Sequence, residues 1–196
     1  MTTRMTLLAV TIAAGCAHRA GVDETPTPLP LQAELVWYAL PGGEFSVLMP
    51  PNAWREEKTR AIAGAEVAIH VLEAMPVGAR ESYMVSYAGF PPELLKKAST
   101  AEIIDGVQHS MLRDVGGQLV TSKELVAEDM PGREFQVHKA GQGNILARVL
   151  VGNDGIFTIV ATYRSAQPPD AVLRFESSFS RRGSAASADP SAQRLR

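Results

Sequence analysis

An α+β domain, built on an antiparallel sheet of about six to eight strands, is predicted by three features of the chain. Segments rich in β-branched and aromatic residues recur along it, and glycine, proline, asparagine or aspartate lies between them. One long segment repeats its apolar residues at helical spacing instead. The last four strand-like segments follow one another with breaks too short for a parallel crossover, so they are predicted to form an antiparallel meander.

The first half of the domain is predicted to be strands, because β-branched and aromatic residues are bounded there by glycine or proline. These strands are expected at residues 35–40, 44–49, 67–72 and 83–87. Residues 55–63 are assigned neither to a strand nor to a helix. The proline pairs Pro50-Pro51, Pro91-Pro92 and Pro168-Pro169 are each expected to end one element or to begin another.

A helix from residue 99 to residue 116 is the main helical prediction. Ser99 and Glu102 have the spacing of a capping box at its start. Apolar residues then recur at helical period until Gly116-Gly117 ends the pattern, and they are Ile103, Ile104, Val107, Met111 and Leu112. This amphipathic helix is expected to cover the sheet, and residues 93–97 are expected to form a short helical turn before it.

The meander is predicted at residues 119–128, 133–139, 144–151 and 156–164, with breaks at "DMPG", "AGQG" and "GNDG". A closing helix over residues 168–179 begins with proline and places Val172, Phe175 and Phe179 on one face. Because consecutive strands joined by tight turns cannot be parallel, this order disfavours a doubly wound, dinucleotide-binding fold.

The N-terminus has the layout of an export signal. Arg4 precedes an apolar segment at residues 5–14, which is too short to cross a bilayer as a permanent helix, and small residues follow. Cys16, the single cysteine of the chain, comes next. Residues 12–16, "IAAGC", resemble the lipobox of bacterial lipoproteins, which implies that the Cys16 thiol is acylated and becomes the first residue after cleavage. The alternative is an ordinary secretory signal cut after Gly15 or Ala17.

The sequence therefore predicts four parts. Residues 1–15 are a lipoprotein signal peptide, and residues 16–32 are the lipidated Cys16 and a proline-rich tether. Residues 33–180 form a single domain. Residues 181–196 have almost no large apolar residue and are predicted to be a disordered tail. The lipobox resemblance, with Ala17 after the cysteine, implies attachment in the bacterial cell envelope, at the outer membrane and facing the periplasm.

Charge and motifs exclude several function classes. With Lys+Arg 19 against Asp+Glu 21, the formal net charge is −2, so nucleic acid is not an expected partner. The chain has no glycine-rich phosphate loop and none of the familiar zinc, redox or nucleophile-elbow motifs. The sequence therefore predicts no catalytic residue, no cofactor and no metal site, and an enzyme is the less favoured reading.

Histidines carry the alternative hypothesis, an envelope hydrolase that uses His70 or His138 with a carboxylate. His138 alternates with Val137 and shares a face with Glu134. If the two strands were neighbours, His70, His138 and Glu134 could converge on a metal or a proton. Ordinary polar-face histidines are the simpler interpretation of the pattern.

A possible binding patch is formed by Arg133, Glu134, Arg148 and His138 on the predicted meander. Arg148 lies between Ala147 and Val149, so its guanidinium is expected to need a partner, and Glu134 is one strand away. A structural ion pair is the first interpretation, and an anion-binding patch is the alternative.

Several segments of residues 42–179 resemble small exported bacterial proteins with the PsbP-like, DcrB-like fold. The resemblance is carried by "GGEFSVLMPP", "YMVSYAGFPP", "MPGREF", "ARVLVGNDGIFTIVATY" and "FESSF". It implies an antiparallel sheet covered by helices and a noncatalytic accessory or binding domain, and it implies no functional residue. The expected protein is thus a membrane-anchored lipoprotein that binds an envelope protein or a small ligand.

Overall fold

A computed structural model describes residues 35–39, 45–62 and 64–181. Its seven-stranded antiparallel sheet has the order β3-β4-β5-β9-β8-β7-β6. These strands are β3 (Trp54–Ile62), β4 (Ala65–Ala74), β5 (Ser82–Gly89), β6 (Gln118–Ala127), β7 (Met130–Lys139), β8 (Gly143–Val151) and β9 (Gly155–Tyr163). The α+β prediction is confirmed. The predicted four-strand meander, β6 to β9, forms one half of the sheet and includes its β6 edge.

A second, three-stranded sheet has the order β1-β2-β10, with β1 (Val36–Ala39), β2 (Phe45–Met49) and β10 (Ser180–Arg181). Ser180 and Arg181 pair with Ser46 and Phe45, so the end of the domain closes on its beginning. Arg181, assigned to the tail from the sequence, therefore belongs to the folded domain. The predicted signal peptide, the tether and residues 182–196 lie outside the described residues.

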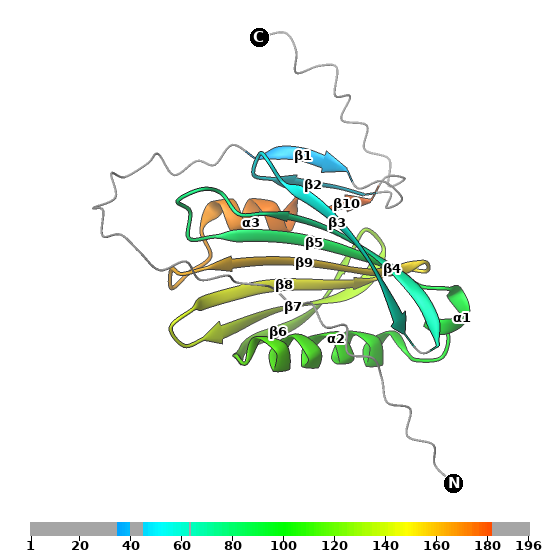
Figure 1. Cartoon of the computed structure of the whole chain (residues 1–196). Helices are drawn as coiled ribbons and strands as arrows, with labels where there is room; N and C mark the ends of the chain where they lie inside the picture. Colours follow the sequence, from blue (N-terminus) through cyan, green and yellow to red (C-terminus); the bar gives the residue numbers. More distant parts are fainter. Residues whose placement is uncertain (1–34, 40–44, 63, 182–196) are drawn as a thin grey trace.

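Helices cover the two faces of the large sheet (Figure 1). Helix α2 (Thr100–Val115), preceded by the short α1 (Pro92–Leu95), packs on one face through Ile104 and Val107. Helix α3 (Asp170–Ser177) and the small sheet lie on the other face. There, Val172 and Phe175 pack into a separate hydrophobic core cluster with Phe45, Tyr83 and Phe157. No helix in the described residues is both long and apolar enough to cross a membrane.

Helix α2 begins and ends where the sequence predicts. The Ser99 hydroxyl accepts a hydrogen bond from the Glu102 backbone N–H, and the Glu102 carboxylate accepts one from the Ser99 N–H in return. Gly116 ends the helix at φ 67°, in the left-handed region that glycine adopts at low cost. These contacts lie within a few residues of one another, which is why the sequence alone identifies both ends.

The turn between β6 and β7 differs from the prediction. Glu128 and Asp129, at φ 51° and 59°, form a two-residue turn, and Met130, Pro131 and Gly132 of the predicted "DMPG" break belong to β7. Pairing with β8 starts only at Gly132, so no bond to β8 requires the missing N–H of Pro131. A Cβ at Gly132 would collide with the Val149 carbonyl oxygen, which explains glycine there without a turn.

Replacing Asp129 with glycine is expected to raise the free energy of unfolding by about 0.5–1 kcal/mol. A two-residue turn with positive φ at both positions is the kind in which glycine is preferred. Urea denaturation of the two proteins measures the difference. Asp170→Gly, in the first turn of α3, is the control and should be destabilising; a loss of stability at both positions would contradict the strain assigned to Asp129.

Candidate functional site

Three charged side chains form a row across the meander. Lys123 of β6 is directly opposite Glu134 of β7, and Glu134 is directly opposite Arg148 of β8. Lys123 Nζ lies 2.7 Å from Glu134 Oε1, while Nε and Nη2 of Arg148 each lie 2.7 Å from Glu134 Oε2. The predicted pairing of Arg148 with Glu134 is present, and Lys123 extends it to a third strand.

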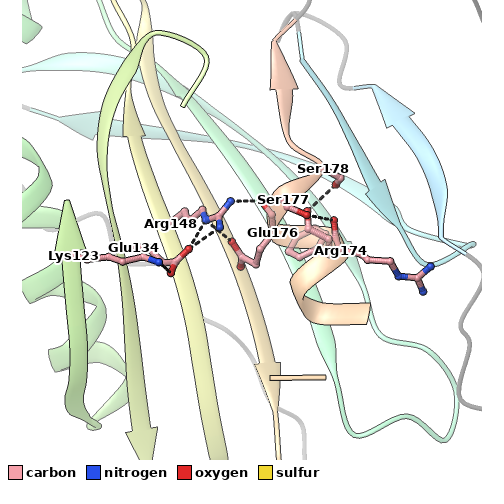
Figure 2. Close-up of polar contacts among 8 residues, drawn as sticks. Lys123, Glu134, Arg148, Arg174, Glu176, Ser177 and Ser178 are labelled. Carbon is pink, nitrogen blue, oxygen red and sulfur yellow. Dashed lines mark hydrogen bonds and ion pairs between the residues drawn. The ribbon is translucent and has the colours of Figure 1, made fainter. Parts of the chain in front are cut away.

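Helix α3 brings a fourth charged residue, Glu176, to the end of this row (Figure 2). Its side chain is 1% exposed, and its Oε2 lies 3.7 Å from Nε of Arg148. Arg148 is also bonded to the backbone of α3, because its Nη1 donates a 2.6 Å hydrogen bond to the Glu176 carbonyl oxygen. Within the described residues, neither carboxyl oxygen of Glu176 has a hydrogen-bond partner.

The two carboxyl groups of the row have opposite electrostatic environments. Burial raises the pKa of Glu134, but hydrogen bonds from Lys123 and Arg148 outweigh it, and the net pKa lies below the ordinary value. Burial raises the pKa of Glu176 as well, and there Arg148 opposes it too weakly to prevail, while Glu134 adds to it. The pKa of Glu176 therefore lies well above the ordinary value of 4.5, and two nearby carboxyl groups differ in protonation over a range of pH.

Arg133 does not join this row, because consecutive residues of a strand point to opposite faces. Its guanidinium is directed to helix α2, where Nη1 donates to the carboxylate of Asp105 and to Oε1 of Gln108 at 2.9 Å. The hydroxyl of Ser122 donates to the same Gln108 oxygen. Arg133 thus fixes α2 to the sheet, on the face opposite Glu134 and Arg148.

His138 shares the face of Glu134 but has its own partners. Its Nδ1 lies 2.9 Å from Oδ1 of Asn144, and the Asn144 amide donates to the Ser165 carbonyl oxygen. Gln136, between the two on that face, donates to the Tyr163 hydroxyl at 2.6 Å. Of the four residues in the predicted patch, the structure brings Glu134, Arg148 and His138 to one face and Arg133 to the other.

His70 and His138 do not converge. Three strands separate β4 from β7, so the two histidines are about 19 Å apart across the sheet. His70 Nδ1 lies 3.6 Å from Glu57 Oε2 of the neighbouring edge strand, and its ring stacks on Tyr87 at a centroid distance of 6.3 Å. The condition under which His70, His138 and Glu134 would form one site is therefore not met.

The part of the chain that the structure describes has no metal-binding cluster, and it has a small cavity beneath α2. It contains no group of three or more His, Cys, Asp or Glu side chains placed to hold a metal ion. Beneath α2 there is a small cavity of about 10 Å³, lined by Ile69, Ser86, Ala88, Val107, Ile156 and Thr158. That volume accommodates about one water molecule, so this cavity is not a substrate pocket.

Lys123 and Glu176 are absent from the patch predicted from the sequence. For Glu176, however, the helical spacing of its neighbours could have indicated a buried position. Val172, Phe175, Glu176 and Phe179 have the spacing i, i+3, i+4, i+7, which places a carboxyl group on the apolar face of the closing helix. Lys123 had no such signal, since its pairing depends on the register of β6 against β7.

The sequence matches no protein-family model and no curated protein. Among solved structures, the chain is similar to cyanobacterial PsbP (CyanoP) from Synechocystis sp. PCC 6803, whose structure was determined in solution. The similarity has a TM-score of 0.53 at 12% sequence identity, and it covers 81% of this chain and 98% of that chain. The chain therefore has a PsbP-like fold, as the resemblance predicted, and at this identity the similarity shows the fold alone.

Proposed function

We propose that this chain is a bacterial envelope lipoprotein, in which a lipid on Cys16 holds a noncatalytic accessory domain at a membrane. The observation that carries the proposal is the "IAAGC" segment at residues 12–16, followed by a proline-rich stretch and then by a PsbP-like domain. Several acyl chains on one residue anchor a protein stably, since each buried CH₂ contributes about 0.8 kcal/mol. The outer membrane, facing the periplasm, is the proposed location.

The arrangement of the charged residues supports an accessory role. Arg148, Glu134 and Lys123 are bonded to one another, and Arg148 is also bonded to the backbone of α3. Arg133 is likewise bonded to α2. These charged groups of the meander thus connect the helices to the sheet, and this structural use supports a noncatalytic domain.

Replacing Cys16 with serine is expected to move the protein from the detergent phase to the aqueous phase after Triton X-114 partitioning of the producing cells. Serine offers no thiol to the lipid-transferring enzyme, so the acyl chains that hold the protein in detergent would be missing. Thr3→Ser, in the same leader, is the control and should leave the protein in the detergent phase.

Mass spectrometry of the membrane fraction provides the second measurement. The proposal expects an N-terminal peptide that begins at Cys16 and carries the mass of the acyl chains. An unmodified thiol on a chain that begins at another residue, or equal partitioning of the Cys16→Ser and parent proteins, would refute the lipid anchor.

A further inference from the structure

Near its C-terminal end, helix α3 carries a buried carboxyl group that forms no hydrogen bond with any described residue. Glu176 is the penultimate residue of α3, so its side chain lies where the last carbonyl groups of the helix accumulate negative charge. It is 1% exposed, and both carboxyl oxygens lack a hydrogen-bond partner among the described residues. An ionised carboxylate in that position would be strongly disfavoured, because a buried charge needs both a partner and hydrogen bonds.

The nearest cation is already engaged. Nε and Nη2 of Arg148 are directed to Glu134, and Nη1 is bonded to the Glu176 backbone. Lys123 is 68% exposed and also pairs with Glu134. Ionisation of Glu176 would therefore place a second carboxylate beside one guanidinium that Glu134 already occupies.

Other titratable and charged groups lie on the elements packed around α3, among them Arg181 of β10, whose Nη2 pairs with Asp154 Oδ2 at 2.8 Å. On the large sheet, the titratable residues of this face are His70 of β4, Tyr83 and Tyr87 of β5, Tyr163 of β9, Arg148 of β8, Glu134 and His138 of β7, and Lys123 of β6. Burial raises the pKa of Tyr83 to about 12, and burial also raises the pKa of Tyr163, so both phenols keep their protons. Strand β2 presents the apolar residues Phe45, Val47 and Met49.

We propose that Glu176 is a proton-operated latch: α3 docks on the sheet with the Glu176 carboxyl group protonated, and loss of that proton releases α3 together with β10. The latch holds a defined segment, because Val172 and Phe175 of α3 are fully buried and the Ser178 hydroxyl accepts a hydrogen bond from the Leu48 N–H of β2. Release would uncover the apolar cluster that α3 and the small sheet close. This inference goes beyond the proposed function and does not depend on the lipid anchor.

The direction of the pH dependence follows from the two states of Glu176. In the released state the carboxyl group is solvated and titrates near its ordinary value of 4.5, whereas in the docked state its pKa is well above that value. Docking is therefore strongest below pH 4.5. Between the two pKa values each release gives up one proton, and the released fraction rises about tenfold for each pH unit.

Hydrogen-deuterium exchange measured by mass spectrometry from about pH 5 to about pH 9, corrected for intrinsic exchange rates, tests the latch. In the parent protein, protection of peptides covering residues 170–181 is expected to fall as pH rises, while β9 at the centre of the sheet keeps its protection. In Glu176→Gln, an uncharged side chain of the same shape, protection of residues 170–181 should be high and independent of pH. Asp170→Asn, an exposed acid on the same helix, should retain the pH dependence of the parent.

A second variant shifts the latch without altering Glu176. Glu134→Gln leaves Arg148 free to pair with Glu176 and removes a nearby negative charge, so the upper end of the pH-dependent range should move to lower pH. Equal pH dependence in the parent and in Glu176→Gln would overturn the proposal. So would a loss of protection that is the same in β9 and in residues 170–181, because that pattern indicates global unfolding and not the release of α3.

Discussion

Replacing Arg148 with methionine is expected to lower the free energy of unfolding by about 3 kcal/mol. The substitution leaves Glu134, whose side chain is 14% exposed, without its main partner, and it removes the donor that holds the carbonyl oxygen of Glu176. We place the effect at the low end of the range for breaking a buried ion pair, because Lys123 still reaches Glu134. Urea denaturation at neutral pH measures the change.

The same substitution should have a characteristic pH dependence. The pKa of Glu134 is lowered in the folded state, so the stability that its pairing contributes is present above its unfolded pKa, near 4.5, and is lost as pH falls through the folded value. The deficit of Arg148→Met relative to the parent should therefore shrink below pH 4.5.

Lys123→Met is the matched control for this prediction. It removes the other cation from the same carboxylate, but the lysine side chain is 68% exposed, so the loss should stay below about 1 kcal/mol. If Lys123→Met and Arg148→Met lowered the free energy of unfolding by the same amount, the burial of the Arg148–Glu134 pair would have no effect on stability, contrary to the prediction.

Replacing Ile104 with aspartate is expected to unfold the domain. Ile104 is 5% exposed and packs from α2 into the core cluster that includes Phe135, Val149 and Ile156. An unpaired carboxylate there would cost more than about 4 kcal/mol, which is a large share of the 5–15 kcal/mol that holds a typical domain together. Circular dichroism and the thermal transition should show the loss.

Ala101→Asp introduces the same residue at an exposed position in the first turn of the same helix. An acidic side chain near a helix N-terminus is neutral to mildly stabilising, so this variant should keep the melting temperature of the parent. A folded Ile104→Asp protein with the parent melting temperature would show that this face of α2 contributes nothing to the core.

The elements that the sequence predicted well are those specified by nearby residues. The Ser99–Glu102 capping box, the Gly116 end of α2 and the hairpin breaks "AGQG" and "GNDG" each involve residues within a few positions of one another. The one wrong turn, at "DMPG", failed because proline and glycine have a second use within a strand: Pro131 lies before the pairing with β8 begins, and Gly132 allows close approach of β8.

Strand β3 was not predicted from the sequence, because it lies at the edge of the large sheet and lacks the pattern of a half-buried strand. Its charged residues Arg55, Glu56, Glu57, Lys58 and Arg60 lie on both faces of the strand, so the apolar alternation that identifies a half-buried strand is missing. Only its pairing with β4, from Trp54 opposite Glu73 to Ile62 opposite Ala65, defines it.

The candidate site was partly predictable. Alternation along β7 was enough to separate Arg133 from Glu134, since neighbours on a strand point to opposite faces. The position of Glu176 on an apolar helix face was equally visible. The contact between Glu176 and Arg148 was not, because it joins residues 28 positions apart through the docking of α3.

By itself, the sequence determined the α+β class, the main helix and its caps, the antiparallel meander and the pairing of Arg148 with Glu134. These features depend on short-range spacing and on strands joined by tight turns. The tertiary structure alone decided that β5 lies beside β9, that a second sheet joins both ends of the domain, and that the Glu176 carboxyl group is buried with no hydrogen-bond partner among the described residues. The physical reason is distance along the chain: contacts such as that of Leu48 with Ser178, 130 residues apart, follow from the packing of whole elements and have no local signal.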